Sequence, residues 1–266
     1  MPASLKLLDQ YGDDLQVLFV ESQGASSPEA SAFVLKQKWL GRANGIWTIE
    51  HPCDSGSPGL PSAVLIGGDG RVLFNGNPLD GHKEIMRLIE QDNASRHSAP
   101  TDTPKALEPA WKEFGKGRIA SAFKLLDGIA EKDRGALGDA WQTTRDEFLK
   151  RTQNQIARAQ WELDNGYPTR CANRLDGLAK ACEGQADLKK SIDEVRAKLN
   201  GPEGKAERDA AKSLERVEAT FYEKGGDDAS RKDLERVLGK SSTTKVAERL
   251  RAVLAIGGGA SAPAKK

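Results

Sequence analysis

Two short apolar runs around a glycine-rich turn constrain the fold of this chain more than any other feature of the sequence. The runs are Ser62–Ile66 and Arg71–Phe74, and the turn between them is Gly67–Gly70, with the sequence GGDG. Runs of β-forming residues joined by a Gly/Asp turn are typical of an antiparallel hairpin. Pro61 stands directly before the first run, where it removes no hydrogen-bond donor from the interior of a strand. We therefore expect a β-hairpin at this place.

The residues before and after the hairpin alternate between helical and extended patterns. Apolar residues recur at three- and four-residue spacing in a helix with one packed face, and they follow one another without a break in a buried strand. In chain order, the patterns predict a helix ending at Gly12, a strand over Leu15–Val20, a helix from Pro28 to Gly41 with Ser27 as N-cap, a strand over Ile46–Ile49 and, after the hairpin, a helix over Asp80–Gln91 capped by Asp80.

This order of elements resembles the later part of a thioredoxin-like domain, in particular that of the TlpA-type disulfide reductases. The resemblance rests on the segments Gly59–Ser62, Asp69–Gly70 and Gly76–Pro78, and it covers about residues 1–91. It implies that Pro61 is cis and that the backbone at Leu60 pairs with an extended peptide, as in strand addition. The residues alone give an X-Pro bond only a small chance of being cis.

A complete domain of this family starts with a strand and a W-C-x-x-C motif, whereas this chain has no C-x-x-C. Pro2, Leu5, Leu8 and Tyr11 resemble the segment that follows the motif in the family. One alignment therefore makes Met1 an internal position, with the redox motif and any export signal upstream. The missing strand is central in the family's sheet, so the remaining strands would leave a gap or pair differently.

A second alignment makes Leu15–Val20 the first strand and Ser22–Pro28 a degenerate active-site loop without cysteines. It leaves only Cys53–Leu60 before Pro61, which is too short for the usual intervening helix. The first alignment is therefore favoured, although both remain open. In either case Ser22, Gln23 and Ser26 cannot perform thiol–disulfide exchange, because that reaction needs a thiolate. We expect these three side chains to cap the loop.

The second half of the chain is helical and contains an internal repeat. Gly117, Leu126, Asp127, Gly128 and Ala130 recur 49 residues later as Gly166, Leu175, Asp176, Gly177 and Ala179, and a fainter copy 59 residues further on has Gly225, Leu234 and Val237. Each unit predicts a helix, a glycine turn and a second amphipathic helix, which is the unit of tetratricopeptide-like solenoids. The repeat spacing exceeds the 34 residues of a strict tetratricopeptide.

The cysteines and histidines provide few candidates for chemistry. Cys53 lies two residues after His51 and eight before Pro61, so it is a possible reactive thiol, or else a loop cysteine without a role. Cys171 and Cys182 are expected to fill small positions in the helical core. The three histidines, His51, His82 and His97, have no acidic residue or cysteine at ligand spacing, so no metal site and no cofactor are expected.

Composition limits the classes of partner. The formal net charge is +1, from 40 basic and 39 acidic residues, which gives no general attraction to nucleic acid or to an anionic membrane. No apolar run approaches the ~20 residues that span a bilayer. Residues 1–20 show no signal-peptide pattern. The protein would be periplasmic if an export signal precedes Met1, and cytoplasmic otherwise.

Charged runs such as Lys189–Lys190 and Lys205–Lys212 are expected to be solvated helix faces. The five tryptophans are expected to be core anchors, and they are Trp39, Trp47, Trp111, Trp141 and Trp161.

The sequence thus predicts an α+β fold class with two domains. An incomplete thioredoxin-like domain (1–91) is joined by a linker (92–104) to an all-α tetratricopeptide-like domain (105–256), followed by a disordered tail (257–266). The expected function is that of a protein of thiol–disulfide oxidoreductase ancestry, inert in this form, with a protein or peptide partner. The alternative is a non-enzymatic peptide-binding scaffold. Leu60 and Pro61 are the expected peptide-binding residues.

Overall fold

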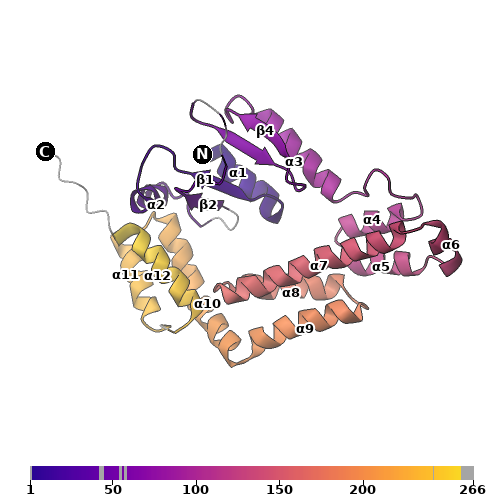
Figure 1. The fold of residues 1–266 in the computed structure, drawn as a ribbon. Helices are drawn as coiled ribbons and strands as arrows, with labels where there is room; N and C mark the ends of the chain where they lie inside the picture. The colour runs from indigo at the N-terminus through magenta and orange to yellow at the C-terminus, as the bar shows by residue number, and fades with distance from the viewer. Residues whose placement is uncertain (1, 42–44, 54–55, 57–58, 242, 259–266) are drawn as a thin grey trace. The chain divides into compact units, whose positions relative to one another are not determined.

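The computed structural model describes residues 2–41, 45–53, 56, 59–241 and 243–258 (Figure 1). The first part of the chain has the elements α1 (Pro2–Tyr11), a short 3₁₀ turn (Gly12–Asp14), β1 (Val17–Val20), α2 (Ser27–Lys36), β2 (Gly45–Thr48), β3 (Ala63–Ile66), β4 (Val72–Gly76) and α3 (His82–Arg96). The rest of the described chain is helical: α4 (Glu108–Gly115), α5 (Ile119–Asp127), α6 (Glu131–Ala136), α7 (Ala140–Asp164), α8 (Pro168–Ala181), α9 (Ala186–Asn200), α10 (Pro202–Glu223), α11 (Asp228–Leu238) and α12 (Lys245–Gly258). The class is therefore α+β, as expected.

The described strands form two separate two-stranded sheets and not one continuous sheet. β1 and β2 are parallel, with Leu18 opposite Ile46 and Phe19 opposite Trp47. β3 and β4 form the antiparallel hairpin that the sequence predicts, with an irregularity between Leu65 and Ile66. A two-stranded sheet leaves one edge of each strand without a ladder partner, so each sheet depends on the packing of one face for its stability.

The β1–β2 sheet buries one face against α1. Phe19 is buried together with Leu5 and Leu8 of α1, and its ring stacks on Trp47 with the ring centroids 4.2 Å apart. Trp39 extends this stack, at 5.8 Å from Trp47. The opposite face exposes apolar side chains, because Leu18 and its cross-strand partner are 40% and 49% exposed.

The β3–β4 hairpin is fastened to α3 through its turn (Figure 1). The carboxylate of Asp92 accepts a hydrogen bond from the Gly68 amide at 3.1 Å, and it also pairs with Arg96 one helical turn further on. Two predictions were wrong here. α3 is preceded by Gly81 as N-cap rather than by Asp80, and it continues to Arg96, so the first residues of the predicted linker are helical.

The helix α2 begins with a capping box one residue earlier than predicted. The N-cap is Ser26, not Ser27, and its side chain and backbone both bond to the carboxylate of Glu29. The helix ends at Lys36, before the predicted end at Gly41. Phe33, an apolar residue of this helix, is 54% exposed, whereas Val34 and Leu35 are buried.

The three sequence repeats have the same helix ending in the structure. Each repeat glycine has a positive φ, +75° at Gly117, +75° at Gly166 and +69° at Gly225. At each site the glycine amide donates a hydrogen bond to the carbonyl of the residue three positions earlier. The amide of the residue after the glycine donates to the carbonyl five positions before that residue. These two bonds define the Schellman motif, which favours glycine because the turn requires a left-handed backbone. The repeat is thus a recurrent helix–turn–helix unit.

The second helix of each repeat also buries the same two positions. The first position is a small residue, Ala122, Cys171 or Ser230, and each is at most 1% exposed. The second position, four residues later, is a leucine in every copy, Leu126, Leu175 or Leu234, and each is fully buried. Positions four apart lie on one helix face, so this face alternates a small and a large side chain towards the neighbouring helix. Cys171 and Cys182 therefore fill small core positions, as predicted.

Contacts divide the chain into two compact units. One unit contains Met1–Pro52, Trp161–Arg170 and Lys198–Lys266, and the other contains Cys53–Gln160 and Cys171–Ala197. This grouping differs from the predicted division in chain order at residues 92–104. In the first unit, the N-terminal residues group with the C-terminal helices because α2 packs on them. Leu35 of α2 is 3% exposed within the apolar cluster of α10, α11 and α12.

The α2 contact is tight because glycines line it. A Cβ atom added to Gly226 would lie 2.6 Å from the Leu35 side chain, and one added to Gly41 would lie 2.9 Å from the ring of Tyr222. Leu40 packs against the same cluster. Gly257 and Gly258, the start of the predicted tail, belong to α12, and the remainder of that prediction lies outside the described residues.

Candidate functional site

The candidate peptide-binding residues lie directly before β3. The Leu60–Pro61 peptide bond is cis, so the prediction of a cis bond is confirmed. Leu60 is 61% exposed. Pro61 is also exposed, and the buried hydroxyl oxygen of Ser62 has no hydrogen-bond partner among the described residues. Leu60 is thus an exposed leucine next to a strand that, among the described strands, pairs only with β4.

Apolar side chains continue this exposed surface along the hairpin. Ile66 of β3 and Val72 of β4 are cross-strand partners, and they are 53% and 61% exposed. Leu79, between β4 and α3, is 71% exposed. Exposed apolar side chains that follow a free strand edge are a feature of surfaces that pair with an extended peptide. We refer to Leu60, Ile66, Val72 and the β3 edge as the hairpin surface.

The hairpin turn holds this surface in a fixed geometry. The Gly67 amide bonds to the Arg71 carbonyl at 2.9 Å, and the Asp69 carboxylate accepts the Arg71 amide at 3.0 Å. The bond between Asp92 and the Gly68 amide connects the turn to α3. Asp92 was not expected in this role, because residues 92–104 were predicted to be a linker. The only signal in the sequence for a helix that includes Asp92 is the helical spacing of the apolar residues from Ile85 to Ile89.

The thiols do not form a redox centre in the described structure. Cys53 is exposed, whereas Cys171 and Cys182 are buried, and none of the three forms a disulfide bond. Burial raises the pKa of the Cys182 thiol to about 11, which disfavours its thiolate. His51 and Cys53 are both exposed, and part of the loop that follows Cys53 lies outside the described residues. A dithiol able to cycle between reduced and oxidised forms is therefore not assembled by these residues.

The loop after β1 uses its polar groups to cap backbone. The Glu21 carboxylate accepts hydrogen bonds from the amides of Gln23, Gly24 and Ala25, at 2.7 to 3.1 Å. Ser26 caps α2. The loop-capping role predicted for this segment is confirmed for Ser26, and the main capping group, Glu21, was missed because a loop glutamate has no sequence signature of its own.

A polar cluster is buried beneath the C-terminal helices. Arg249 of α12 forms a bidentate ion pair with Glu218 of α10, and the two side chains are 15% and 12% exposed. The guanidinium group also lies over the Tyr167 ring, 4.4 Å from its centroid. Burial and the nearby Glu218 carboxylate raise the pKa of Tyr222. These groups satisfy one another, so the cluster fixes helix packing and offers no open coordination or reaction site.

Trp161 departs from the predicted role of the tryptophans. It is 45% exposed and stacks on Tyr167 at 6.1 Å, whereas Trp111 is 3% exposed and packs against Phe148. No group of three or more potential metal-ligating side chains occurs in the part of the chain that the structure describes.

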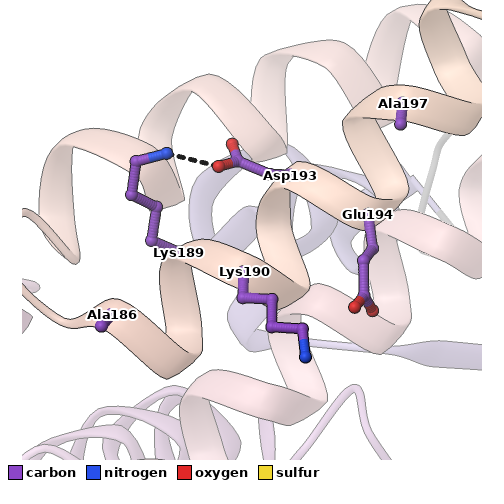
Figure 2. A pocket seen from close by; sticks show the side chains of 6 residues that line it. All are labelled: Ala186, Lys189, Lys190, Asp193, Glu194 and Ala197. Atoms are coloured by element: carbon purple, nitrogen blue, oxygen red, sulfur yellow. Dashed lines mark hydrogen bonds and ion pairs between the residues drawn. The ribbon is translucent and has the colours of Figure 1, made fainter.

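A shallow hollow of about 550 Å³ lies along the exposed side of α9 (Figure 2). Its lining residues all come from this one helix, and they are Ala186, Lys189, Lys190, Asp193, Glu194 and Ala197. Lys189 forms an ion pair with Asp193 one turn further on. The prediction of a solvated face at Lys189–Lys190 is confirmed, because both residues are exposed.

Comparison with known proteins does not place the chain in a family. No protein-family model matches it, and no curated protein or solved structure shows significant similarity. Among the described residues, no helix combines the length and apolar character needed to cross a membrane. A functional assignment has to be argued from the hairpin surface, the thiols and the helical units.

Proposed function

We propose that residues 1–266 form a non-catalytic protein-binding module, which accepts an extended polypeptide along the edge of β3 beside Leu60 and Pro61. The observation that carries the proposal is the hairpin surface. It combines an unpaired strand edge with exposed apolar side chains at Leu60, Ile66 and Val72, on a hairpin anchored to α3. Backbone hydrogen bonds to the edge would supply affinity, and contacts with alternate side chains would supply selectivity.

The proposal includes a thioredoxin-like ancestry for about residues 1–91. The order of α1, β1, α2, β2, the hairpin and α3 supports it, as do the parallel pairing of β1 with β2 and the antiparallel pairing of β3 with β4. The tetratricopeptide-like units would form the scaffold that presents the module.

Disulfide reduction by these residues is not part of the proposal. The reaction needs an attacking thiolate and a second thiol to resolve the mixed disulfide. The chain has one exposed cysteine, Cys53, while Cys171 and Cys182 are buried in helical core positions. We therefore expect no turnover when the chain is given insulin and a reductant that regenerates dithiols.

A screen of the full chain against a displayed library of random peptides tests the binding function. We expect enrichment of peptides with apolar residues at alternate positions, because such residues face one side of an added strand. Leu60→Asp should abolish their binding. The matched control is Leu125→Asp, since Leu125 is also an exposed leucine, at 43%, but lies on α5. It should leave binding unchanged.

Backbone methylation of an enriched peptide gives a second readout. N-methylation at alternate amides should remove binding in one register and spare it in the other, because only every second amide of an added strand faces the edge. The proposal fails if no peptide is enriched, or if enriched peptides bind the Leu60→Asp chain as well as the parent.

A further inference from the structure

The charges on the exposed face of α9 change sign at each position when the direction of the helix is reversed. From the N-terminal end its residues are alanine, two lysines, two acidic residues and alanine. Reversal of the helix therefore exchanges Ala186 with Ala197, and it exchanges each lysine with an acidic residue. Lys189 takes the place of Glu194, and Lys190 takes the place of Asp193.

These residues lie on one side of the helix. Their spacing of three and four positions is that of a single helical face. The other side of α9 is packed, and its buried residues are Leu188, Ile192, Val195 and Leu199. The charged face is thus held in place by core packing, and Figure 2 shows Lys189 turned towards Asp193 along this face.

We propose that this face docks onto the same face of a second copy of the chain, with the two α9 helices antiparallel across a two-fold axis. In such an isologous contact, residue i meets residue j and residue j meets residue i. Lys189 of each copy then lies opposite Glu194 of the other, and Lys190 lies opposite Asp193. The alanines meet at both ends of the contact. The proposal concerns a different surface from the hairpin surface and does not depend on the peptide-binding function.

The shape of the face fits a helix as its occupant. Ala186 and Ala197 have the smallest side chains after glycine, so they permit helix axes to approach to about 8–10 Å. Between them, the aliphatic stems of Lys189 and Lys190 can cover apolar area while their ammonium groups reach the opposite carboxylates.

Exposure and charge also indicate the strength of the contact. The ion pair between Lys189 and Asp193 within one chain is solvent-exposed, with side-chain exposures of 70% and 46%. Replacing this ion pair within one chain by ion pairs between two chains therefore changes the free energy of association little. One helix face is a small contact, so the dimer is weak, reversible and sensitive to salt.

A charge-swap experiment on the full chain tests this arrangement. K189E/K190E makes all four charged positions acidic, and D193K/E194K makes them all basic. Each variant alone should repel itself, and the dimer dissociation constant should rise about tenfold or more. An equimolar mixture should associate again, because every acidic position then faces a basic one. The control K205E/K232E makes the same change in net charge as K189E/K190E, at exposed lysines outside α9, and it should leave dimerisation unchanged.

Sedimentation equilibrium at up to about 100 µM protein and about 50 mM salt should show a monomer–dimer equilibrium for the parent, which weakens as salt shortens the Debye length. Far-UV circular dichroism verifies that each variant is folded. A parent chain that stays monomeric under these conditions overturns the proposal. It is also overturned if the two α9 variants dimerise like the parent, or if their mixture does not associate.

Discussion

The start of α12 depends on a carboxylate from another helix, and this dependence makes a quantitative prediction. Glu207 of α10 accepts hydrogen bonds from the amides of Lys245 at 2.7 Å and Val246 at 3.0 Å. Glu207 is 9% exposed and Val246 is fully buried. The first amides of a helix have no partner within the helix. The Thr244 side chain accepts a hydrogen bond from the Ala247 amide, and Glu207 serves the Lys245 and Val246 amides.

The expected loss follows from these two bonds. A hydrogen bond to a charged group contributes about 1.5–3 kcal/mol, and a buried donor without a partner costs about 1–3 kcal/mol. Since both bonds end on one carboxylate, we expect Glu207→Ala to lower stability by about 3 kcal/mol in total. Glu207→Gln keeps an acceptor but loses the attraction between charge and helix dipole, so it should cost about 1 kcal/mol.

Hydrogen exchange read by mass spectrometry is the appropriate assay, because a chain with two compact units need not unfold in one step. A loss of about 3 kcal/mol should speed exchange in α12 by about a hundredfold. Glu235→Ala is the matched control, since Glu235 is an exposed glutamate in α11 of the same unit, and it should change stability by less than about 0.5 kcal/mol. Exchange rates for Glu207→Ala within about threefold of the parent would refute the capping argument.

Three further predictions concern local features. Gly117 and Gly166 share a φ of +75°, but a Cβ at Gly117 meets nothing within 4 Å, whereas one at Gly166 lies 2.7 Å from the backbone at the start of α12. Gly117→Ala should therefore lower the free energy of unfolding by about 1 kcal/mol, and Gly166→Ala should lower it clearly more. Urea unfolding measures both losses, and equal losses would contradict a steric clash at Gly166. A thiol reagent should label one cysteine per native chain, Cys53, and all three after denaturation, as counted by intact mass. Asp227 is the N-cap of α11, and hydrogen bonds from the side chain and backbone of Ser230 lower its pKa. The ionised Asp227 therefore stabilises the folded chain fully above its unfolded pKa of about 3.9, and this stabilisation is lost as the pH falls through its lower pKa in the folded chain. Asp227→Asn should thus lie furthest below the parent in stability near neutral pH, with a gap that narrows in acid, and a gap independent of pH would exclude this linkage.

Local patterns in the sequence were sufficient for the elements that depend on local physics. The hairpin required only two β-forming runs and a glycine turn, and β3 and β4 lie where these runs predict. The repeat glycines Gly117, Gly166 and Gly225 were recognised from spacing alone. Each ends a helix with the same pair of hydrogen bonds because a left-handed turn residue is a local requirement.

The caps were predicted less well because several nearby residues have the same capping chemistry. Ser26 and Ser27 are adjacent, and the choice between them is made by Glu29, which lies three residues after Ser26 and completes the capping box. Asp80 has the side chain of a good N-cap, but α3 begins two residues after it. Its neighbour Gly81 is packed against Phe74 of β4, so tertiary contact sets the start of the helix.

Contacts distant in sequence had no signal that one sequence could provide. Glu207 lies in a charged run that looks like a solvated face, yet its carboxylate is buried beneath α12, 38 residues away. Asp92 and Arg249 likewise have partners on other elements. A carboxylate that caps another helix cannot be distinguished by composition from one that faces water, because the difference lies in what the fold brings next to it.

The packing of α2 shows how far an apolar pattern can determine an interface. Periodicity identified Leu35 as an apolar helix position, but it did not say which surface receives that side chain. The receiving surface is formed by α10, α11 and α12, where Gly225 and Gly226 leave room for the helix to approach. In the sequence these glycines end a helix, and both adopt a left-handed backbone, with φ of +69° at Gly225 and +70° at Gly226. The second glycine has a packing role, since a Cβ there would collide with Leu35. Gly226 thus has both a backbone role in the turn and a packing role against Leu35, and only the first of these roles can be inferred from the sequence.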